Sequence, residues 1–186
     1  MFGSNMSYVP PAPVSVGDSH TYRLHAARDA FRNAQSRGSL HRVFASLLRR
    51  PTALKRLSSV VGEGRVTGRH PAGRREVPLN RICGSEGRSR DFDRFFSPLG
   101  GECRQRWISV LLARWMDVPL EPVQLIQIGD DYFVRDGHHR ISVARALGET
   151  CIDAEVTVWS LAGATPSVPE RSRAARRTRP ALKSEG

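Results

Sequence analysis

The chain has few cysteines and no long apolar segment, and both absences limit the class of protein. Its 186 residues include three cysteines, at positions 83, 103 and 151, with wide spacing and no CxxC pair. A scattered, odd set argues against a disulfide framework and a zinc ribbon, and is typical of a reducing cytosol. No apolar run approaches the ~20 residues that span a bilayer. The first residues, MFGSNMSYVPPAPVSVG, lack the features of a secretory signal. We therefore expect a cytoplasmic protein without a membrane span.

Acidic residues are scarce at both ends of the chain. Residues 1–75 contain 13 Lys and Arg against 3 Asp and Glu, and residues 159–186 contain 6 against 2. The central residues, 76–158, contain 10 against 13, so the formal net charge of +11 comes from the two flanks. Such flanks either face a polyanion, such as nucleic acid or an anionic membrane surface, or serve only solubility. Both interpretations stay open at this point.

The N-terminal part of the chain predicts helices. Residues 1–18 are rich in Pro, Gly and Ser, which indicates disorder. Ser19 is a suitable N-cap for a helix that ends at Gly38, and Ser39 is a suitable N-cap for a second helix. The apolar residues of the second helix follow the i, i+3, i+4 spacing; they are Leu40, Val43, Phe44, Leu47 and Leu48. We expect a helical hairpin over residues 19–61 whose role is packing against the rest of the protein or against a protein partner.

The rest of the chain predicts one small domain of the α+β class. Residues 62–75 are basic and glycine-rich, and they are expected to form a linker. The domain, residues 76–159, shows the order strand, loop, helix, strand hairpin, helix, strand. Its strands are expected at Glu76–Ile82, Pro122–Ile128, Tyr132–Arg135 and Ile152–Val158, and its helices at Cys103–Asp117 and from about His139 to Leu147. Pro78 suggests an edge position for the first strand. The tail, residues 160–186, is expected to be disordered and basic.

Titratable and cationic residues gather where a predicted strand meets a predicted helix. The segment FVRDGHHRISVARALG, residues 133–148, passes through Asp136 and Gly137 to two histidines and Arg140. The first turn of a helix has unpaired N–H groups and a partial positive charge, which favour phosphate. Gly137 leaves room for an anion, and the Arg140 guanidinium suits phosphate oxygens. We expect an anion site here; a structural alternative for Asp136 is a helix cap.

A metal site is the weaker interpretation of the same segment. His138 and His139 are adjacent, so their side chains diverge, and no third ligand follows at helical spacing. We therefore expect no metal held by these side chains. A structural alternative for Arg140 is a surface ion pair with one of three carboxylates: Asp93, Asp130 or Glu155.

The span from about Val77 to Val158 resembles the ParB/sulfiredoxin superfamily domain. The resemblance lies in the segments VPLNRI, GRSRDFDRF and PVQLIQIGDDYFVRDGHHRISVARALG, which cover less than half of the chain. In ParB-type proteins the corresponding junction reads Gly-Glu-Arg-Arg and holds the triphosphate of a nucleotide. The resemblance therefore implies that a nucleoside di- or triphosphate, with or without magnesium, binds at Gly137, His138, His139 and Arg140. The upstream loop of that family supplies a further arginine, which matches Arg88 or Arg90.

Departures from individual branches narrow the activity that the resemblance implies. Sulfiredoxin has a catalytic cysteine directly before its His-Arg pair, whereas this chain has His138 there, which argues against sulfinic acid reduction. Partition ParB proteins carry further DNA-binding and dimerisation domains, and the short basic segment after Trp159 argues against site-specific centromere binding. The Asp-Gly-His-His-Arg form is similar to free serine kinases, which transfer phosphate from a nucleotide to the hydroxyl of serine. That similarity implies catalytic roles for Asp136 and His138, with Glu86 as the candidate general base.

Three functions stay open. The first, which we favour, is a ParB-like nucleotide-binding protein whose basic flanks associate nonspecifically with DNA or RNA. The second is a nucleotide-dependent phosphotransferase or phosphohydrolase. The third is a regulatory scaffold in which the helical hairpin docks a protein partner and the pocket senses a small anion.

Overall fold

The computed structural model describes residues 19–49, 51–62, 66–87 and 90–162. Within these residues the helices are α1 (Ser19–Leu47), α2 (Leu57–Val61), α3 (Arg104–Trp115) and α4 (His138–Ala146), with a 3-10 turn at Leu79–Arg81. The strands are β1 (Lys55–Arg56), β2 (Val66–Pro78), β3 (Ile82–Ser85), β4 (Val123–Ile128), β5 (Asp131–Asp136) and β6 (Cys151–Leu161). The predicted α+β class is confirmed. The disorder expected for residues 1–18, and for the tail beyond residue 162, lies outside the described residues.

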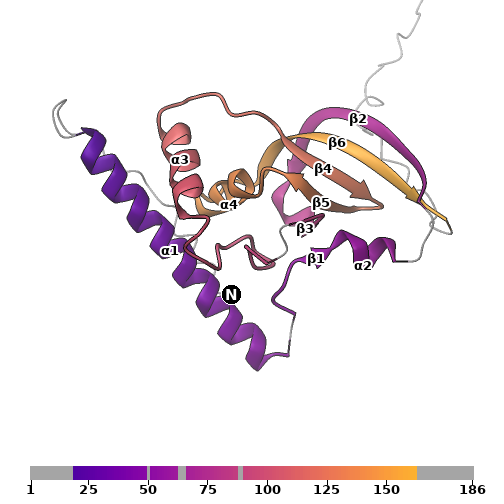
Figure 1. Cartoon of the computed structure of the whole chain (residues 1–186), viewed down its shortest axis with the longest axis horizontal. Coiled ribbons are helices and arrows are strands. Elements are labelled where there is room, and N and C mark those ends of the chain that lie inside the picture. The colour runs from indigo at the N-terminus through magenta and orange to yellow at the C-terminus, as the bar shows by residue number, and fades with distance from the viewer. Residues whose placement is uncertain (1–18, 50, 63–65, 88–89, 163–186) are drawn as a thin grey trace, which may run out of the picture.

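The strands form one mixed sheet in the order β1-β3-β5-β4-β6-β2 (Figure 1). β4 and β5 form the antiparallel hairpin expected at Gly129 and Asp130, and Gly129 has a positive φ of 58°. β3 runs parallel to β5, and β4 runs parallel to β6. β2 pairs only with β6 and forms one edge of the sheet, which agrees with the edge position expected for Pro78.

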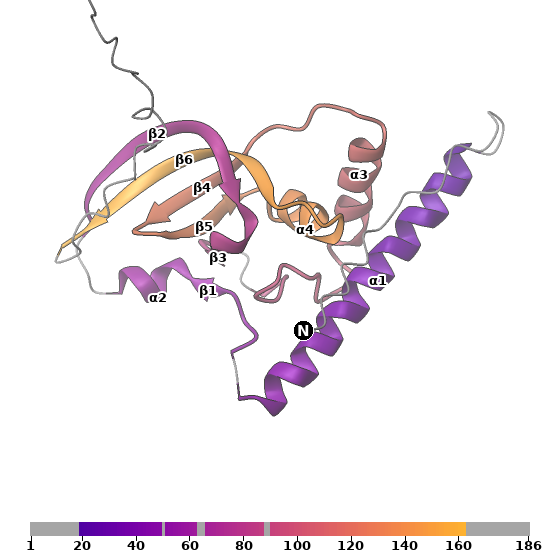
Figure 2. The same cartoon turned by 180° about the vertical axis from the view of Figure 1, so that it is seen from behind.

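Apolar side chains cover both faces of the sheet. On one face Ile141 of α4 joins a core with Leu125 of β4. On the other face Leu57 of α2 packs with Ile126 of β4, and Figure 2 shows α2 on the side of the sheet away from α4. Alternate residues of a strand point to opposite faces, so the consecutive residues Leu125 and Ile126 serve two different cores.

A third cluster of buried side chains joins the helices α1, α3 and α4. Phe31 of α1 meets Trp107 of α3 edge to face, with ring centroids 5.5 Å apart. The many apolar residues between Trp107 and Met116 predict a helix that is buried on nearly all sides, but Ser109 and Arg114 are exposed and only part of α3 is buried. The reason is that α3 packs against α1 and α4, while its remaining side meets solvent. The buried residues of α3 are Trp107, Ile108 and Leu111.

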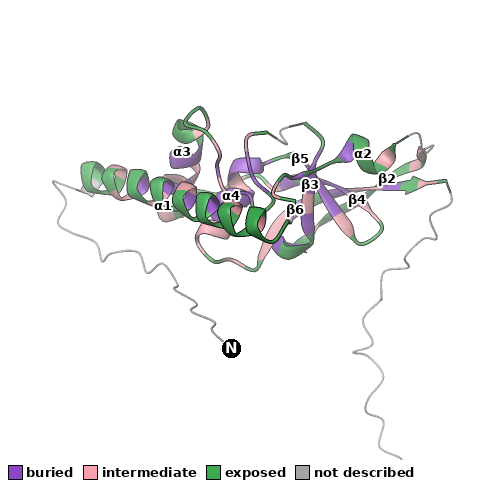
Figure 3. Ribbon diagram, turned by 90° about the horizontal axis from the view of Figure 1, so that it is seen from below, coloured by how far each residue is buried: buried purple, intermediate pink, exposed green. Residues whose placement is uncertain are grey.

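The helical hairpin expected over residues 19–61 is not formed, because α1 continues through Gly38 as a single helix. A Cβ added at Gly38 would lie 2.5 Å from the Ser97 Cβ. The glycine is therefore the point where the loop before α3 crosses the helix, and not the end of a helix. Beyond it, the apolar residues stay exposed at 59 to 81% and form a feature that we call the α1 stripe (Figure 3); they are Leu40, Val43, Phe44, Leu47 and Leu48.

The segment expected as a linker, residues 62–75, is a strand from Val66 onward. Its glycines coincide with irregularities in the pairing of β2 with β6, where the register shifts near Gly68 and Gly73. Two of its arginines contact β6, since Arg69 lies 4.1 Å from the centre of the Trp159 ring and Arg74 forms an ion pair with Asp153. The single strand expected at residues 76–82 is correspondingly the end of β2, a 3-10 turn and the start of β3.

The described helices include none that is both long enough and apolar enough to cross a membrane. All three cysteines are free thiols, as their spacing predicts. β6 extends to Leu161, so this strand ends slightly beyond the domain end expected at residue 159.

Candidate functional site

The Asp-Gly-His-His-Arg segment lies at the junction between β5 and α4. β5 ends at Asp136, Gly137 is the N-cap, and α4 begins at His138, so the predicted change from strand to helix is confirmed. Gly137 has a φ of 97°, a left-handed conformation that favours glycine. A Cβ there would also lie 2.5 Å from Cγ1 of Val123. The fold itself therefore requires this glycine, and the clearance that it offers to a phosphate stays a prediction.

The two histidines belong to the protein core. His138 is 4% exposed, and its Nε2 lies 2.7 Å from the hydroxyl oxygen of Ser85 at the end of β3. Its ring is stacked on Phe92 with centroids 6.0 Å apart, while His139 meets Phe92 edge to face at 5.4 Å. Both imidazoles thus help to fix the loop that carries Phe92 against the start of α4.

Arg140 makes its contacts within the protein. Its Nη2 donates to the Asp136 carboxylate at 2.5 Å, and its Nη1 donates to the carbonyl oxygens of Glu121 and, at 3.1 Å, Pro122. The alternative of an ion pair for Arg140 is correct, but its partner is Asp136 and not one of the three carboxylates considered from the sequence. The guanidinium joins the segment before β4 to the turn before α4. The N-cap residue of α4 is Gly137 and not Asp136, which ends β5 and whose carboxylate accepts from Arg140.

The ends of β3 and β5 bring a second group of predicted residues to the same edge of the sheet. Because the two strands are parallel, Glu86 after β3 lies beside the end of β5, and its carboxylate accepts a hydrogen bond from Arg135 Nε at 3.1 Å. Both of these side chains are partly exposed. Arg90 is exposed in the loop that follows, whereas Arg88 lies outside the described residues. The structure therefore brings Glu86, Arg135 and Asp136 to one partly exposed edge.

Two residues have roles at this junction that were not predicted from the sequence, where Asp93 was considered only as a partner of Arg140. Ser85 holds His138, and its hydroxyl also accepts a hydrogen bond from the Gly87 N–H at 3.2 Å. Asp93 is buried, and one carboxylate oxygen accepts the N–H groups of Phe95 and Ser97, both at 2.8 Å. The N–H groups that Asp93 accepts lie only two and four residues further along the chain. Such a local contact is typical of a turn that begins at an Asp, so the sequence does contain a signal for it. The Ser85–His138 contact has no such signal, because 53 residues separate the partners.

The described residues include no group of three or more His, Cys, Asp or Glu side chains that could hold a metal ion. A nucleotide, by contrast, needs hydrogen-bond donors. The first turn of α4 has such donors, and Arg90 is an exposed donor in the loop after β3, while the Arg140 guanidinium is already bonded to Asp136 and to backbone carbonyls. The junction therefore fits a phosphate group through its backbone and loop more readily than through Arg140.

Comparisons with known proteins identify a distant likeness in fold. No protein-family model matches the chain, and no curated protein matches it. Among solved structures, sulfiredoxin from Arabidopsis thaliana is similar over 45% of this chain and 82% of that chain, with 18% sequence identity and a TM-score of 0.35. A likeness of this extent is too distant to assign an activity.

Proposed function

We propose that the chain is a member of the ParB/sulfiredoxin superfamily that binds a nucleoside di- or triphosphate, with or without magnesium, where β3 and β5 end and α4 begins. The observation that supports this proposal is the arrangement of two parallel strands whose carboxyl ends meet beside a helix N-terminus. Ligands of α/β sheets bind outside the carboxyl ends of parallel strands, and a helix N-terminus favours phosphate.

In the proposed complex, some residues at this edge contact the phosphate and others stabilise the junction between β5 and α4. Arg90, together with Arg88, contacts phosphate from the loop after β3, and the first turn of α4 supplies backbone N–H groups at His138, His139 and Arg140. Two side chains stabilise the junction: the buried His138 through Ser85, and the partly exposed Arg140 through Asp136. Gly137 permits the turn between the strand and the helix.

A second candidate function is phosphoryl transfer or phosphate hydrolysis, by analogy with free serine kinases. It is favoured by two carboxylates near the same edge, since the side chain of Glu86 is 40% exposed and that of Asp136 is 67% exposed. In this reaction Glu86 would take the proton of the acceptor hydroxyl, and Asp136 would lie near the acceptor or a magnesium ion. The buried His138 would position the junction.

The experiment is a thermal-shift titration with ATP, ADP and CTP, with and without magnesium, combined with detection of released phosphate or phosphoserine. Arg90→Ala is expected to remove most of the nucleotide-induced shift in Tm, whereas Arg28→Ala, an exposed arginine on α1, serves as the matched control. Arg140→Ala is expected to reduce the shift measured from its own ligand-free Tm. No shift with any nucleotide would reject the proposal, and product formation with serine would favour the enzyme.

Association with nucleic acid is proposed on the distribution of charge. α1 carries five arginines and one aspartate, and the segment beyond residue 162 is also basic; the arginines of α1 are Arg23, Arg28, Arg32, Arg37 and Arg42. The logarithm of the binding constant falls linearly with the logarithm of the salt concentration, and each phosphate contact makes that slope steeper by about 0.9. Replacing Arg171, Arg173 and Arg176 with Gln is expected to lower that slope for duplex DNA. An unchanged slope and affinity would exclude a role for the tail.

The α1 stripe supports the third function, a scaffold that docks a protein partner. Five large apolar side chains on one helix face are exposed, although such groups are usually buried. Basic side chains, including Arg37 and Arg42, lie on the same half of the helix, and no acidic residue occurs between residues 30 and 62. A partner that matches this surface is an amphipathic helix that presents an apolar face with acidic margins. Binding of an acidic amphipathic helix that is lost in Phe44→Ser would support this function.

A further inference from the structure

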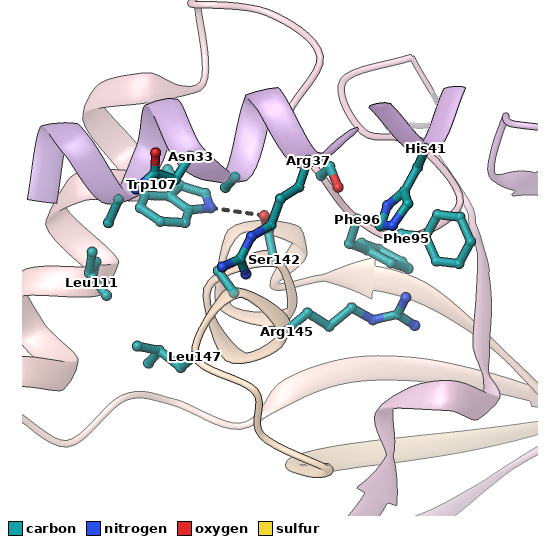
Figure 4. A pocket seen from close by; sticks show the side chains of 14 residues that line it. Asn33, Arg37, His41, Phe95, Phe96, Trp107, Leu111, Ser142, Arg145 and Leu147 are labelled. Atoms are coloured by element: carbon teal, nitrogen blue, oxygen red, sulfur yellow. Dashed lines mark hydrogen bonds between the residues drawn. The ribbon is translucent and has the colours of Figure 1, made fainter. Parts of the chain in front are cut away.

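A cavity of about 270 Å³ lies on the other side of α4 from the sheet, between α1, α3, α4 and the turn at residues 95–97 (Figure 4). Its floor is formed by buried side chains, among them Trp107 of α3 and Ser142 of α4. The Trp107 Nε1–H donates to the Ser142 hydroxyl oxygen at 2.8 Å. Phe95, Phe96 and Leu147 add apolar surface to the walls. The interior is therefore mainly apolar, with one hydroxyl group at its base.

Basic residues, and no acidic ones, are among the side chains that line the cavity. No Asp or Glu lines it, whereas Arg37, His41 and Arg145 do. Figure 4 shows the Arg37 side chain extending from α1 across the cavity toward Ser142. Arg37 is exposed, and within the described part of the chain its guanidinium forms no hydrogen bond or ion pair. This cation is thus available to a ligand in the cavity.

Arg145 is a second arginine at the cavity, but its guanidinium is bonded within the protein. Its Nη2 donates to the carbonyl oxygens of Leu79 and Ile82, and its guanidinium lies 5.0 Å from the centre of the Phe96 ring. Burial lowers the pKa of Arg145, and the negative charge of Asp93 opposes that change. Arg145 therefore helps to form the wall, and Arg37 is the cation available to a ligand.

The position of α1 over the cavity is set by close packing. Gly38 brings the helix within contact distance of Ser97, and Phe31 packs against Trp107. His41 lies against Phe95, with ring centroids 4.8 Å apart. Contacts on both sides of Arg37 along α1 therefore fix this part of the helix, and the packing of the helices defines the cavity.

We propose that this cavity is a second binding site, separate from the proposed nucleotide site, for a small aromatic anion such as an aryl carboxylate. The aromatic ring would lie against Trp107 and Phe96, and the carboxylate would lie against the Arg37 guanidinium. An apolar cavity of about 150 Å³ holds one benzene ring, so the larger volume here suits one or two rings with an acidic side group. Ion pairing with the Arg37 guanidinium distinguishes the acid from a neutral compound of the same shape.

The test is a titration of the full chain with phenylacetate and with phenylacetamide, followed by the indole N–H signals in a ¹⁵N–¹H NMR spectrum. The signal that is lost in Trp107→Phe is that of Trp107. The other indoles, of Trp115 and Trp159, do not line the cavity and serve as internal controls. We expect phenylacetate to shift the Trp107 signal in a saturable way, with an affinity at least about tenfold above that of phenylacetamide. Equal affinities, or no shift of this signal with phenylacetate, would overturn the proposal.

Variants separate the charge from the cavity itself. Arg37→Gln is expected to weaken phenylacetate binding about tenfold and to leave the binding of phenylacetamide unchanged. Arg28→Gln removes an exposed arginine elsewhere on α1 and should leave both affinities unchanged. Ala30→Leu, which places a larger side chain in the wall, is expected to weaken the binding of both compounds.

Phenylacetate binding that is unaffected by both Arg37→Gln and Ala30→Leu would assign the ligand to another site and overturn the inference. Arg90→Ala should leave phenylacetate binding unchanged, so this test is independent of the nucleotide test.

Discussion

The Ser85 hydroxyl oxygen lies 2.7 Å from His138 Nε2, and this hydrogen bond joins the end of β3 to the first residue of α4. Both side chains are buried. The Gly87 N–H also donates to the Ser85 oxygen, so the loop after β3 starts from the same point. The contact thus fixes the relative position of the three elements that form the proposed nucleotide site.

Ser85→Ala is expected to lower the free energy of unfolding by about 1–3 kcal/mol, because a buried imidazole nitrogen loses its partner. Urea denaturation followed by circular dichroism measures the change. Ser109→Ala is the control, since Ser109 is exposed and its hydroxyl donates only to a carbonyl of its own helix. A loss for Ser85→Ala no larger than that of the control would show that the contact adds little to stability.

Gly38→Ala is expected to destabilise the protein by about 1–3 kcal/mol, because the new methyl group would overlap Ser97. In an unhindered helix the same change stabilises by up to about 1 kcal/mol. The sign of the effect therefore reports whether the loop crosses the helix at this residue. In the double variant Gly38→Ala with Ser97→Gly, most of the loss should be recovered. A stabilising effect of Gly38→Ala alone would contradict the packing.

The Cys83 thiol is expected to make stability fall at alkaline pH. Burial, and next the negative charge of Asp131, raise its pKa from 9.0 to about 11. A pKa raised by folding gives a stabilisation that is complete below pH 9.0 and is lost as the pH rises to about 11. Urea denaturation across this range should show a smaller decline for Cys83→Ala than for the unchanged chain. Cys151→Ala is the control; an identical decline in Cys83→Ala would exclude the thiol as its source.

The α1 stripe is expected to be dispensable for folding and to bind apolar probes. Phe44→Ser combined with Leu47→Ser should change the free energy of unfolding by less than about 0.5 kcal/mol, since both side chains are exposed. The same variant should lose most of the fluorescence of the dye ANS bound to the native chain. Val118→Ser replaces another exposed apolar residue and should leave the fluorescence unchanged. A cooperative loss of stability in the double variant would show instead that the stripe is packed.

The junction of β5 and α4 could be predicted from the sequence, whereas its contacts could not. A short apolar run, Tyr132 to Val134, changes to a helical pattern across Gly137, and this local change marks the boundary. The partners of Arg140 depend on where the segment before β4 lies, and the partner of His138 comes from β3. Arg145 is a similar case, because its spacing along α4 suggests a solvated side chain, while the fold places it over Phe96.

The errors at the N-terminal side have two physical causes. Gly38 has the local features of a helix end, but its missing side chain serves a contact with Ser97, and only the folded chain shows that contact. Residues 66–75 have the composition of a linker, yet an edge strand tolerates glycine and proline because one of its sides makes no ladder hydrogen bonds. Pairing with β6 then fixes the conformation of the segment. The contacts involved join residues far apart along the chain, such as Arg69 and Trp159.

The amino-acid sequence by itself determined the α+β class, the order of the elements after Pro78, the free thiols and the position of the Asp-Gly-His-His-Arg segment between a strand and a helix. These features depend on local periodicity, on residue type and on turn residues. The tertiary structure decided that the histidines are buried, that Arg140 is bonded internally, that α1 is one helix with an exposed apolar face, and that Arg37 and Arg145 line one cavity. Each of these depends on atoms that lie far apart along the chain and meet only when the sheet and the helices pack together.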